Sequence, residues 1–378
     1  MPRTLIDKGY VLSICKQTES LLSEEGSIDN SKVKIATFNL FNYLEPPNAF
    51  YEFERIYSIE QWTKKQQWIT DYLSEFKPDI IGFQEVFSSE SLRELVNHQG
   101  YQYFQVVEEP QIESDFIYSH PVVAIASRYP IVDTQTVSVD ANLAVAMGLS
   151  KDFSFSRNVL RATIDIPHLG FTDCYVVHFK SKRSMIEAET NRKNSIEAQY
   201  TEQLKSQIAG RWASSIQRGS EAALMLTSMF SRREEKGFPM VLMGDFNTSL
   251  SDGVLNHLLT HDLYELKKHN SHLFNHYYCL QDSWQLYLNF NQLNLQSSTP
   301  LDIDHNNEQR VSTHYYGGKG SVLDYILLSC EFDACYQGSI FELSSYQVYD
   351  RHLINPIFDR DGESTDHGVV LTTLKLRG

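Results

Sequence analysis

The chain has 378 residues, of which 42% are hydrophobic and 21% charged, the composition of a globular protein, which excludes a disordered tail or a collagen-like chain. Its 48 acidic and 33 basic residues give a net charge of −15, which disfavours non-specific binding to duplex nucleic acid. The sequence contains neither a transmembrane-length apolar run nor a secretory signal, and its five cysteines form no CxxC pair. We therefore expect a cytoplasmic protein with reduced thiols and no structural zinc.

Residues 1–32 lack sustained periodicity, and we interpret them as an N-terminal tail or strap. Ordered structure is expected from Val33 onward. Short apolar runs that are rich in β-branched residues then predict buried strands. These runs cover residues 33–38, 79–84, 122–127, 159–166, 174–179, 240–246, 322–329 and 368–376.

Between the first two predicted strands, an apolar stripe runs from Ile59 to Phe76 at helical spacing. It stops at Lys77-Pro78, as a helix does before proline. Strands outnumber helices and no Pro/Gly/Ser-rich linker divides the chain. The sequence therefore predicts one α/β domain over residues 33–378.

A helical insertion is predicted at about 183–236, where apolar residues recur every three or four positions. Gly210 and Gly219 are interpreted as breaks, which predicts two or three helices in series. Between residues 180 and 236 there are 11 basic and 7 acidic residues, which fits either a substrate-facing surface or a solvated helix face. Arg211 and Arg218 share one helical face, which binds a substrate phosphate if it turns toward a cleft and is solvated if it turns outward.

Acidic, amide and histidine residues stand at the ends of several predicted strands. Converging carboxylates are the ligands that a hard divalent cation such as Mg²⁺ requires, and Glu85 is the strongest candidate ligand. Histidine can orient a phosphate or move a proton near neutral pH. Singly, each of these residues could equally be a core or turn residue, so the prediction rests on the whole set. The set comprises Asn39, Glu85, His178, Asp245, Asn247, Asp366 and His367.

Six motifs follow one another along the chain: TFNLFNY (37–43), DIIGFQEV (79–86), VVHFKSK (176–182), MGDFNTS (243–249), VLDYIL (322–327) and STDHGVV (364–370). In this order they strongly resemble the motifs of the endonuclease/exonuclease/phosphatase superfamily, which includes deoxyribonucleases, abasic-site endonucleases, sphingomyelinases and inositol polyphosphate phosphatases. The resemblance covers about residues 33–376 and implies a four-layered α/β sandwich, with two packed β-sheets flanked by helices.

The resemblance implies roles for individual residues. Glu85 corresponds to the main metal ligand, with Asn39 and Asp366 near the same ion, which is Mg²⁺ or Mn²⁺. The implied catalytic residues are His178 on the scissile phosphate, Asp245 on the attacking water, Asn247 on the phosphate, and His367 as general base or transition-state stabiliser, oriented by Asp324.

Three further residues are predicted to bind substrate. Arg157 resembles an arginine that deoxyribonuclease-like members direct at phosphate, although an exposed salt bridge fits it equally well. Tyr315, beside Tyr316, is a candidate for stacking on a base or sugar, and a packed surface loop is the alternative. Arg218 is the third, on the helical face described above.

The prediction is a divalent-metal-dependent phosphoesterase, and the preferred form is an endonuclease or exonuclease that cleaves phosphodiester bonds by direct water attack. The substrate is a phosphoester, with single-stranded or short nucleic acid among the candidates, and nothing in the sequence calls for an obligate protein partner. The phrase HFKSKR and the long helical insertion resemble a bacterial branch of the superfamily. A phosphatase or phosphodiesterase acting on a small or lipid-derived phosphoester, and a non-catalytic binding module, remain the alternatives.

Overall fold

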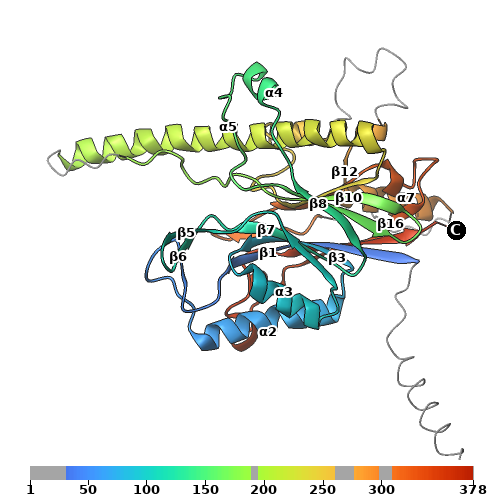
Figure 1. Cartoon of the computed structure of the whole chain (residues 1–378), viewed down its shortest axis with the longest axis horizontal. Coiled ribbons are helices and arrows are strands. Elements are labelled where there is room, and N and C mark those ends of the chain that lie inside the picture. The colour runs from blue at the N-terminus through green and yellow to red at the C-terminus, as the bar shows by residue number, and fades with distance from the viewer. Residues whose placement is uncertain (1–30, 189–194, 260–275, 298–308, 378) are drawn as a thin grey trace, which may run out of the picture.

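In the computed structural model, which describes residues 31–188, 195–259, 276–297 and 309–377, two six-stranded sheets pack face to face with helices on their outer sides (Figure 1). Sheet one has the order β16 (Phe341–Tyr349), β17 (Val369–Leu376), β1 (Lys32–Tyr43), β3 (Ile80–Val86), β7 (Val122–Ser127) and β4 (Tyr103–Val106). Sheet two has the order β12 (Gln281–Asp282), β15 (Asp324–Leu328), β11 (Met240–Asp245), β10 (Gly170–His178), β9 (Leu160–Ile166) and β8 (Ile131–Thr136). All eight runs predicted to be strands form strands.

Three apolar layers hold the sandwich together. The middle layer lies between the sheets, where Ile35 and Ile125 of sheet one belong to the same buried cluster as Val176 and Met243 of sheet two. Alternate residues of each sheet face outward, since side chains along a strand point to opposite faces. On sheet one, the outward-facing apolar residues are buried against α2 (Ile59–Phe76) and α3 (Ser89–His98), and on sheet two they are buried against α5 (Ile196–Lys236). This arrangement confirms the predicted four-layered α/β sandwich.

The remaining elements are short and surround the sandwich. They are β2 (Ala49–Phe50), β5 (Gln111–Ser114), β6 (Ile117–Ser119), the hairpin β13 (His314–Tyr316) and β14 (Lys319–Ser321), α4 (Ala141–Ala146), α7 (Ser283–Ser297), α8 (Arg351–Ile354), α9 (Phe358–Asp361), and the 3-10 helices η1 (Asn256–Leu258) and η4 (Cys330–Phe332).

Helix α2 matches the predicted helix at both ends. Ser58 caps its N-terminus in a reciprocal capping box with Gln61, and Lys77, in the left-handed region, ends it before proline. Residues 1–30, most of the predicted tail or strap, lie outside the described residues.

The predicted breaks in the helical insertion are wrong, because α5 is a single helix of 41 residues. Gly210 and Gly219 lie inside it at points of close packing. A Cβ atom on Gly210 would lie 1.8 Å from Ser184 Oγ, and one on Gly219 would lie 2.9 Å from a methyl carbon of Val254. Glycine here permits close approach of a neighbouring segment, which outweighs its cost of about 1 kcal/mol in a helix.

Candidate active site

The predicted strand-end residues meet at one edge of the sandwich. β1 runs parallel to β3, and β10 runs parallel to β11, so the carboxyl ends of both pairs lie at this edge. β15 and β17 run antiparallel to their neighbours, so the residues at their starts arrive at the same edge. Asn39 joins the two sheets here, because its side-chain amide donates to Asp245 Oδ2 across 3.2 Å.

Glu85 is held by an irregular backbone. Its φ is 60°, and Phe41 and Asn42 on the neighbouring strand also have positive φ, where the β1–β3 pairing shifts register. Such conformations are costly for residues other than glycine and collect at functional sites. They allow the Asn42 backbone N–H to donate to Glu85 Oε2 across 3.0 Å, while the Asn39 amide lies 3.5 Å from Oε1. The carboxylate of Glu85 is thereby fixed at the wall of the cleft.

Asp245 and Asn247 are positioned by the end of β11. Gly244, with φ of 150°, brings the chain so close to β10 that a Cβ atom would lie 1.9 Å from the Val177 carbonyl oxygen. The turn that follows lets the Asn247 backbone N–H donate to Asp245 Oδ1 across 2.7 Å. The Asn247 amide donates to the Phe179 carbonyl across 3.0 Å, so both side chains are fixed.

His367 lies between two carboxylates. Its Nδ1 is 2.8 Å from Asp324 Oδ2, and its Nε2 is 3.9 Å from Asp245 Oδ2. Burial disfavours the imidazolium form, but the charges of Asp324 and Asp245 outweigh this and raise the pKa of His367 well above its usual value. Burial and the neighbouring Asp324 raise the pKa of Asp245. The raised pKa of His367 favours its imidazolium form near neutral pH.

His178 behaves differently from His367, although both line the cleft. Its Nε2 is 3.4 Å from Asp245 Oδ2, and its Nδ1 is buried without a hydrogen-bond partner in the part of the chain that the structure describes. Burial, followed by the nearby charges of Arg157 and His367, lowers its pKa well below the usual value. His178 is a neutral imidazole with one N–H to donate, while His367 is a cation.

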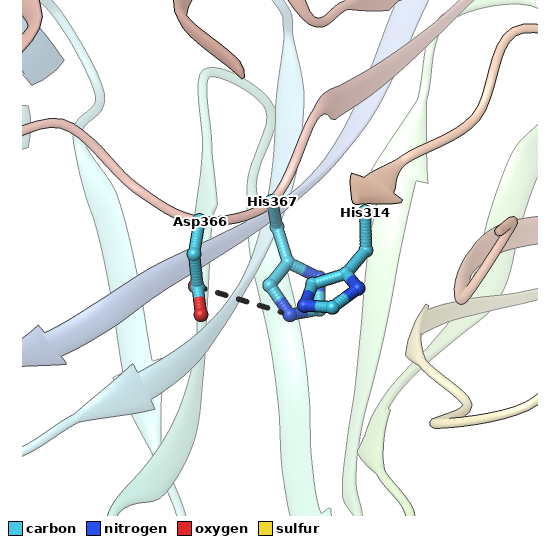
Figure 2. Close-up of side chains that lie close together, drawn as sticks. All are labelled: His314, Asp366 and His367. Atoms are coloured by element: carbon cyan, nitrogen blue, oxygen red, sulfur yellow. Dashed lines mark ion pairs between the residues drawn. The ribbon is translucent and has the colours of Figure 1, made fainter. Parts of the chain in front are cut away.

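A histidine that the sequence did not single out, His314, completes this edge. It forms an isolated β-bridge with His367, and the two ring centroids are 5.2 Å apart. Figure 2 shows Asp366 and His314 on either side of the His367 ring, and Asp366 Oδ1 lies 4.0 Å from His367 Nε2. The atoms of these three residues that could bind a metal ion lie within 4.8 Å of one another. The corresponding atoms of the buried trio Asp245, Asp324 and His367 also lie within 4.8 Å of one another.

These residues fit a divalent cation. Asp366 Oδ1 is buried and has no hydrogen-bond partner among the described residues, and a bound cation would satisfy this carboxylate oxygen. The carboxylates of Glu85 and Asp366 line the same cleft, and oxygen donors are what Mg²⁺ and Mn²⁺ prefer. In the buried trio, by contrast, the carboxylates are already engaged with His367.

Lys65 is a second residue that the sequence analysis missed. Its ammonium group is buried in the middle of α2, donates to the Ser364 carbonyl across 3.0 Å, and lies 5.5 Å from the centroid of the Tyr57 ring. Burial lowers its pKa to about 8, against the raising effect of Asp366 and Glu85. Lys65 therefore anchors the turn that carries Asp366 and His367. Its position in the buried apolar stripe of α2 was the signal in the sequence.

The cleft has a volume of about 920 Å³, and several cations are among the residues that line it. Its cationic residues are Arg157, Lys182, Arg183 and Arg211. Arg157, predicted to bind substrate, lines this cleft, and its buried Nε has no hydrogen-bond partner within the described ranges. Phe41, Tyr51 and Tyr316 add aromatic surface.

Two predicted substrate-binding residues do not reach this cleft. Arg218 is buried and donates to the Lys180 carbonyl across 2.9 Å, so it supports the chain beneath the site. Tyr315 donates to Asp350 Oδ2 across 3.0 Å, and the adjacent Tyr316 lines the cleft in its place. Arg211 and Arg218 share a helical face as predicted. Arg211 lines the cleft, whereas Arg218 is buried in the protein interior.

Comparison with known proteins agrees with this geometry. The sequence matches the model of the Endonuclease/Exonuclease/phosphatase family over residues 36–339. The chain belongs to this family. Its members are phosphoester hydrolases that use divalent metals, and the chain is accordingly a metal-dependent phosphoric ester hydrolase. None of the curated proteins compared with it matches in sequence.

Solved structures share the fold at low sequence identity. The human Nocturnin catalytic domain with bound sulfate is 16% identical, with a TM-score of 0.52, and the match covers 92% of this chain and 95% of that one. TDP2 of D. rerio, humanized by 14 mutations, is 12% identical, with a TM-score of 0.50 over 91% of this chain and 99% of that one. No helix in the described part of the chain has the length and apolar character to cross a membrane.

Proposed function

We propose that this hydrolase is a Mg²⁺-dependent nuclease that cleaves phosphodiester bonds of single-stranded or short nucleic acid. The observation that carries the proposal is the cleft of about 920 Å³, in which the catalytic set lies beside four cationic residues and three aromatic rings. A phosphate monoester group fills only a small part of such a volume. Cationic and aromatic groups along one cleft are what successive phosphates and bases of a single strand contact.

The residues divide the work of hydrolysis as follows. Asp245, whose pKa is raised, is placed to accept a proton from the attacking water. The His367 imidazolium, oriented by Asp324, and the N–H of neutral His178 stabilise the charge that develops on the phosphate oxygens. Asn247 adds a fixed amide beside Asp245. A divalent metal held by Glu85 and Asp366, with Asn39 adjacent, would supply further neutralisation of the charge on the phosphate and the leaving group.

A small phosphoester is the second candidate substrate, and a specific observation favours it. The net charge of −15 opposes the approach of a long polyanion, and the cleft itself contains carboxylates that repel phosphate until a metal is bound. The local cations and the aromatic lining of the cleft favour nucleic acid at short range. The balance between long-range repulsion and local attraction points to short strands over long duplexes.

The test is hydrolysis of a substrate panel by the purified chain, with Mg²⁺, with Mn²⁺ and with chelator. The panel holds single-stranded DNA, RNA, plasmid DNA, bis-p-nitrophenyl phosphate and inositol phosphates. We expect metal-dependent cleavage of single strands that exceeds cleavage of plasmid and is lost in Glu85→Gln. Activity confined to inositol phosphates or other small esters would contradict the nuclease proposal and support the second candidate. Metal binding without turnover of any substrate would support a binding module.

A further inference from the structure

Helix α5 divides into two parts with different surroundings. From Arg218 onward it packs on sheet two, where Met225 and Met229 belong to the buried cluster of that face. Its N-terminal part, residues 196–216, which we call the α5 arm, contributes no residue to that cluster, and the N-terminal end of the helix extends past the edge of the sandwich (Figure 1). One side of the arm is occupied, because the Gly210 carbonyl accepts from Met185 N–H and the Ser206 carbonyl accepts from Ser184 Oγ.

The exposed surface of the α5 arm carries an apolar ridge that winds around the helix by about 40° with every fourth residue. Large apolar residues occur at every fourth position and are between 45 and 86% exposed. Residues four apart are neighbours on a helix surface, so these side chains form one row. Together they present on the order of several hundred Å² of apolar surface, as large as the biggest patch on a typical monomer. The residues are Ile196, Tyr200, Leu204, Ile208, Trp212 and Ile216.

The charges around this ridge are arranged symmetrically about Leu204. Tyr200 and Ile208 lie four residues to either side of it, and Glu197 and Arg211 lie seven residues to either side. At 100° per residue all five fall within about 40° of one line along the helix. The line therefore begins with an acid, ends with a base and is apolar between them.

We propose that the α5 arm is the contact between two copies of this chain, which pair antiparallel about a two-fold axis at Leu204. This arrangement places Tyr200 of one copy against Ile208 of the second and Glu197 against Arg211, while Trp212 flanks the seam. A parallel pairing would place like charges opposite each other. An isologous contact of this kind is the commonest way in which soluble proteins form dimers.

The alternative to a second copy is a lipid surface, but the charges of the α5 arm do not favour membrane binding. The α5 arm carries Glu197, Glu202, Lys205 and Arg211, which sum to zero, and the whole chain carries −15. Helices that lie on membranes are rich in Lys and Arg on their polar face, because cellular membrane surfaces are anionic. Arg211 also lines the substrate cleft, so the proposed pairing brings Glu197 of the second copy to the edge of that cleft.

The test is sedimentation velocity of the full chain over about 1 to 100 µM, the range in which interfaces of this size give measurable dissociation. We expect a dimer of twice the 43.6 kDa chain mass. Leu204→Glu should be monomeric, because it buries a charge at the axis. Glu197→Arg should raise the dissociation constant by about tenfold or more, because it faces Arg211 of the second copy.

Ile59→Glu is the matched control, since Ile59 is exposed on α2, far along the chain from the α5 arm, and it should remain dimeric. Urea unfolding should give the same stability for both glutamate variants. A wild-type chain that stays monomeric at every concentration would overturn the proposal, as would a dimer that survives Leu204→Glu. If the monomeric wild type, but not Leu204→Glu, floats with phosphatidylcholine–phosphatidylserine vesicles, the ridge is a membrane-binding surface instead.

Discussion

Replacing Asp324 with asparagine tests the central arrangement of the site. The carboxylate is about 1% exposed and lies 2.8 Å from His367 Nδ1, so Asp324→Asn removes the charge while keeping a side chain that can still accept the hydrogen bond. The imidazolium that stabilises the charge on the phosphate loses its counter-charge, and kcat should fall by about 10²–10³-fold, the usual contribution of one group that stabilises charge in the transition state. This corresponds to about 3 to 4 kcal/mol of transition-state stabilisation.

The structure also predicts the effect on stability and on pH. Asp324 Oδ1 has no hydrogen-bond partner among the described residues, so the new amide N–H group would be buried without an acceptor, at a cost of about 1–3 kcal/mol. Because Asp324 raises the pKa of His367, the variant should lose the imidazolium at a lower pH than the wild type. The alkaline limb of the kcat profile should therefore move toward lower pH.

Asp173→Asn is the matched control. Asp173 is equally buried in the same sheet but accepts from Arg232 across 3.0 Å, remote from the cleft. It should lower stability without changing the kcat of the folded protein or its pH profile. The assay is steady-state turnover, with saturating metal, of the most active substrate from the panel, together with urea unfolding of each variant. A kcat for Asp324→Asn within threefold of wild type, or an equal loss in Asp173→Asn, would refute the assigned role.

Three other perturbations have definite expected outcomes. Lys65→Met removes a cation whose pKa is lowered by burial to about 8. Between about pH 8 and pH 10.5 the unfolded wild type binds more protons than the folded wild type, so the stability of the wild type should rise with pH relative to the variant. Urea unfolding over this pH range measures the difference. Gly210→Ala should raise KM and lower stability by up to about 2 kcal/mol, because overpacking against Ser184 exceeds the gain in helix propensity; an unchanged KM would contradict this. Arg211→Ala should raise KM without changing the melting temperature, whereas Arg218→Ala should lower the melting temperature, and the opposite result would show that the cleft is misassigned.

The strands were predictable from sequence because each apolar run is short, continuous and β-branched, and the structure turns each into a buried strand. The continuity of α5 was not predictable by the same reasoning. Gly210 and Gly219 raise the cost of a helix locally, and only the presence of Ser184 and Val254 beside them explains why glycine stands there. Those neighbours are distant in the sequence and have no local signature.

The candidate site divides in the same way. Asp245 and Glu85 stand directly after apolar runs, and parallel strands bring such positions to one edge of a sheet. His314 lies beside His367 because of an isolated β-bridge, and no local pattern in the sequence predicts such a bridge. Tyr315 and Tyr316 are adjacent, and only the hairpin geometry decides which of them lines the cleft.

The positions of the cleft residues separate the chemistry from the choice of substrate. Asn39, Glu85, Asp245 and Asp324 lie on strands of the sandwich, so their geometry is fixed by the core. The cations Lys182, Arg183 and Arg211 lie instead on α5 and on the segment before it, which the glycine at position 210 holds against the helix. Substitutions of these three cations should therefore change KM and the preference for single-stranded over duplex nucleic acid, while leaving kcat on a small ester nearly unchanged.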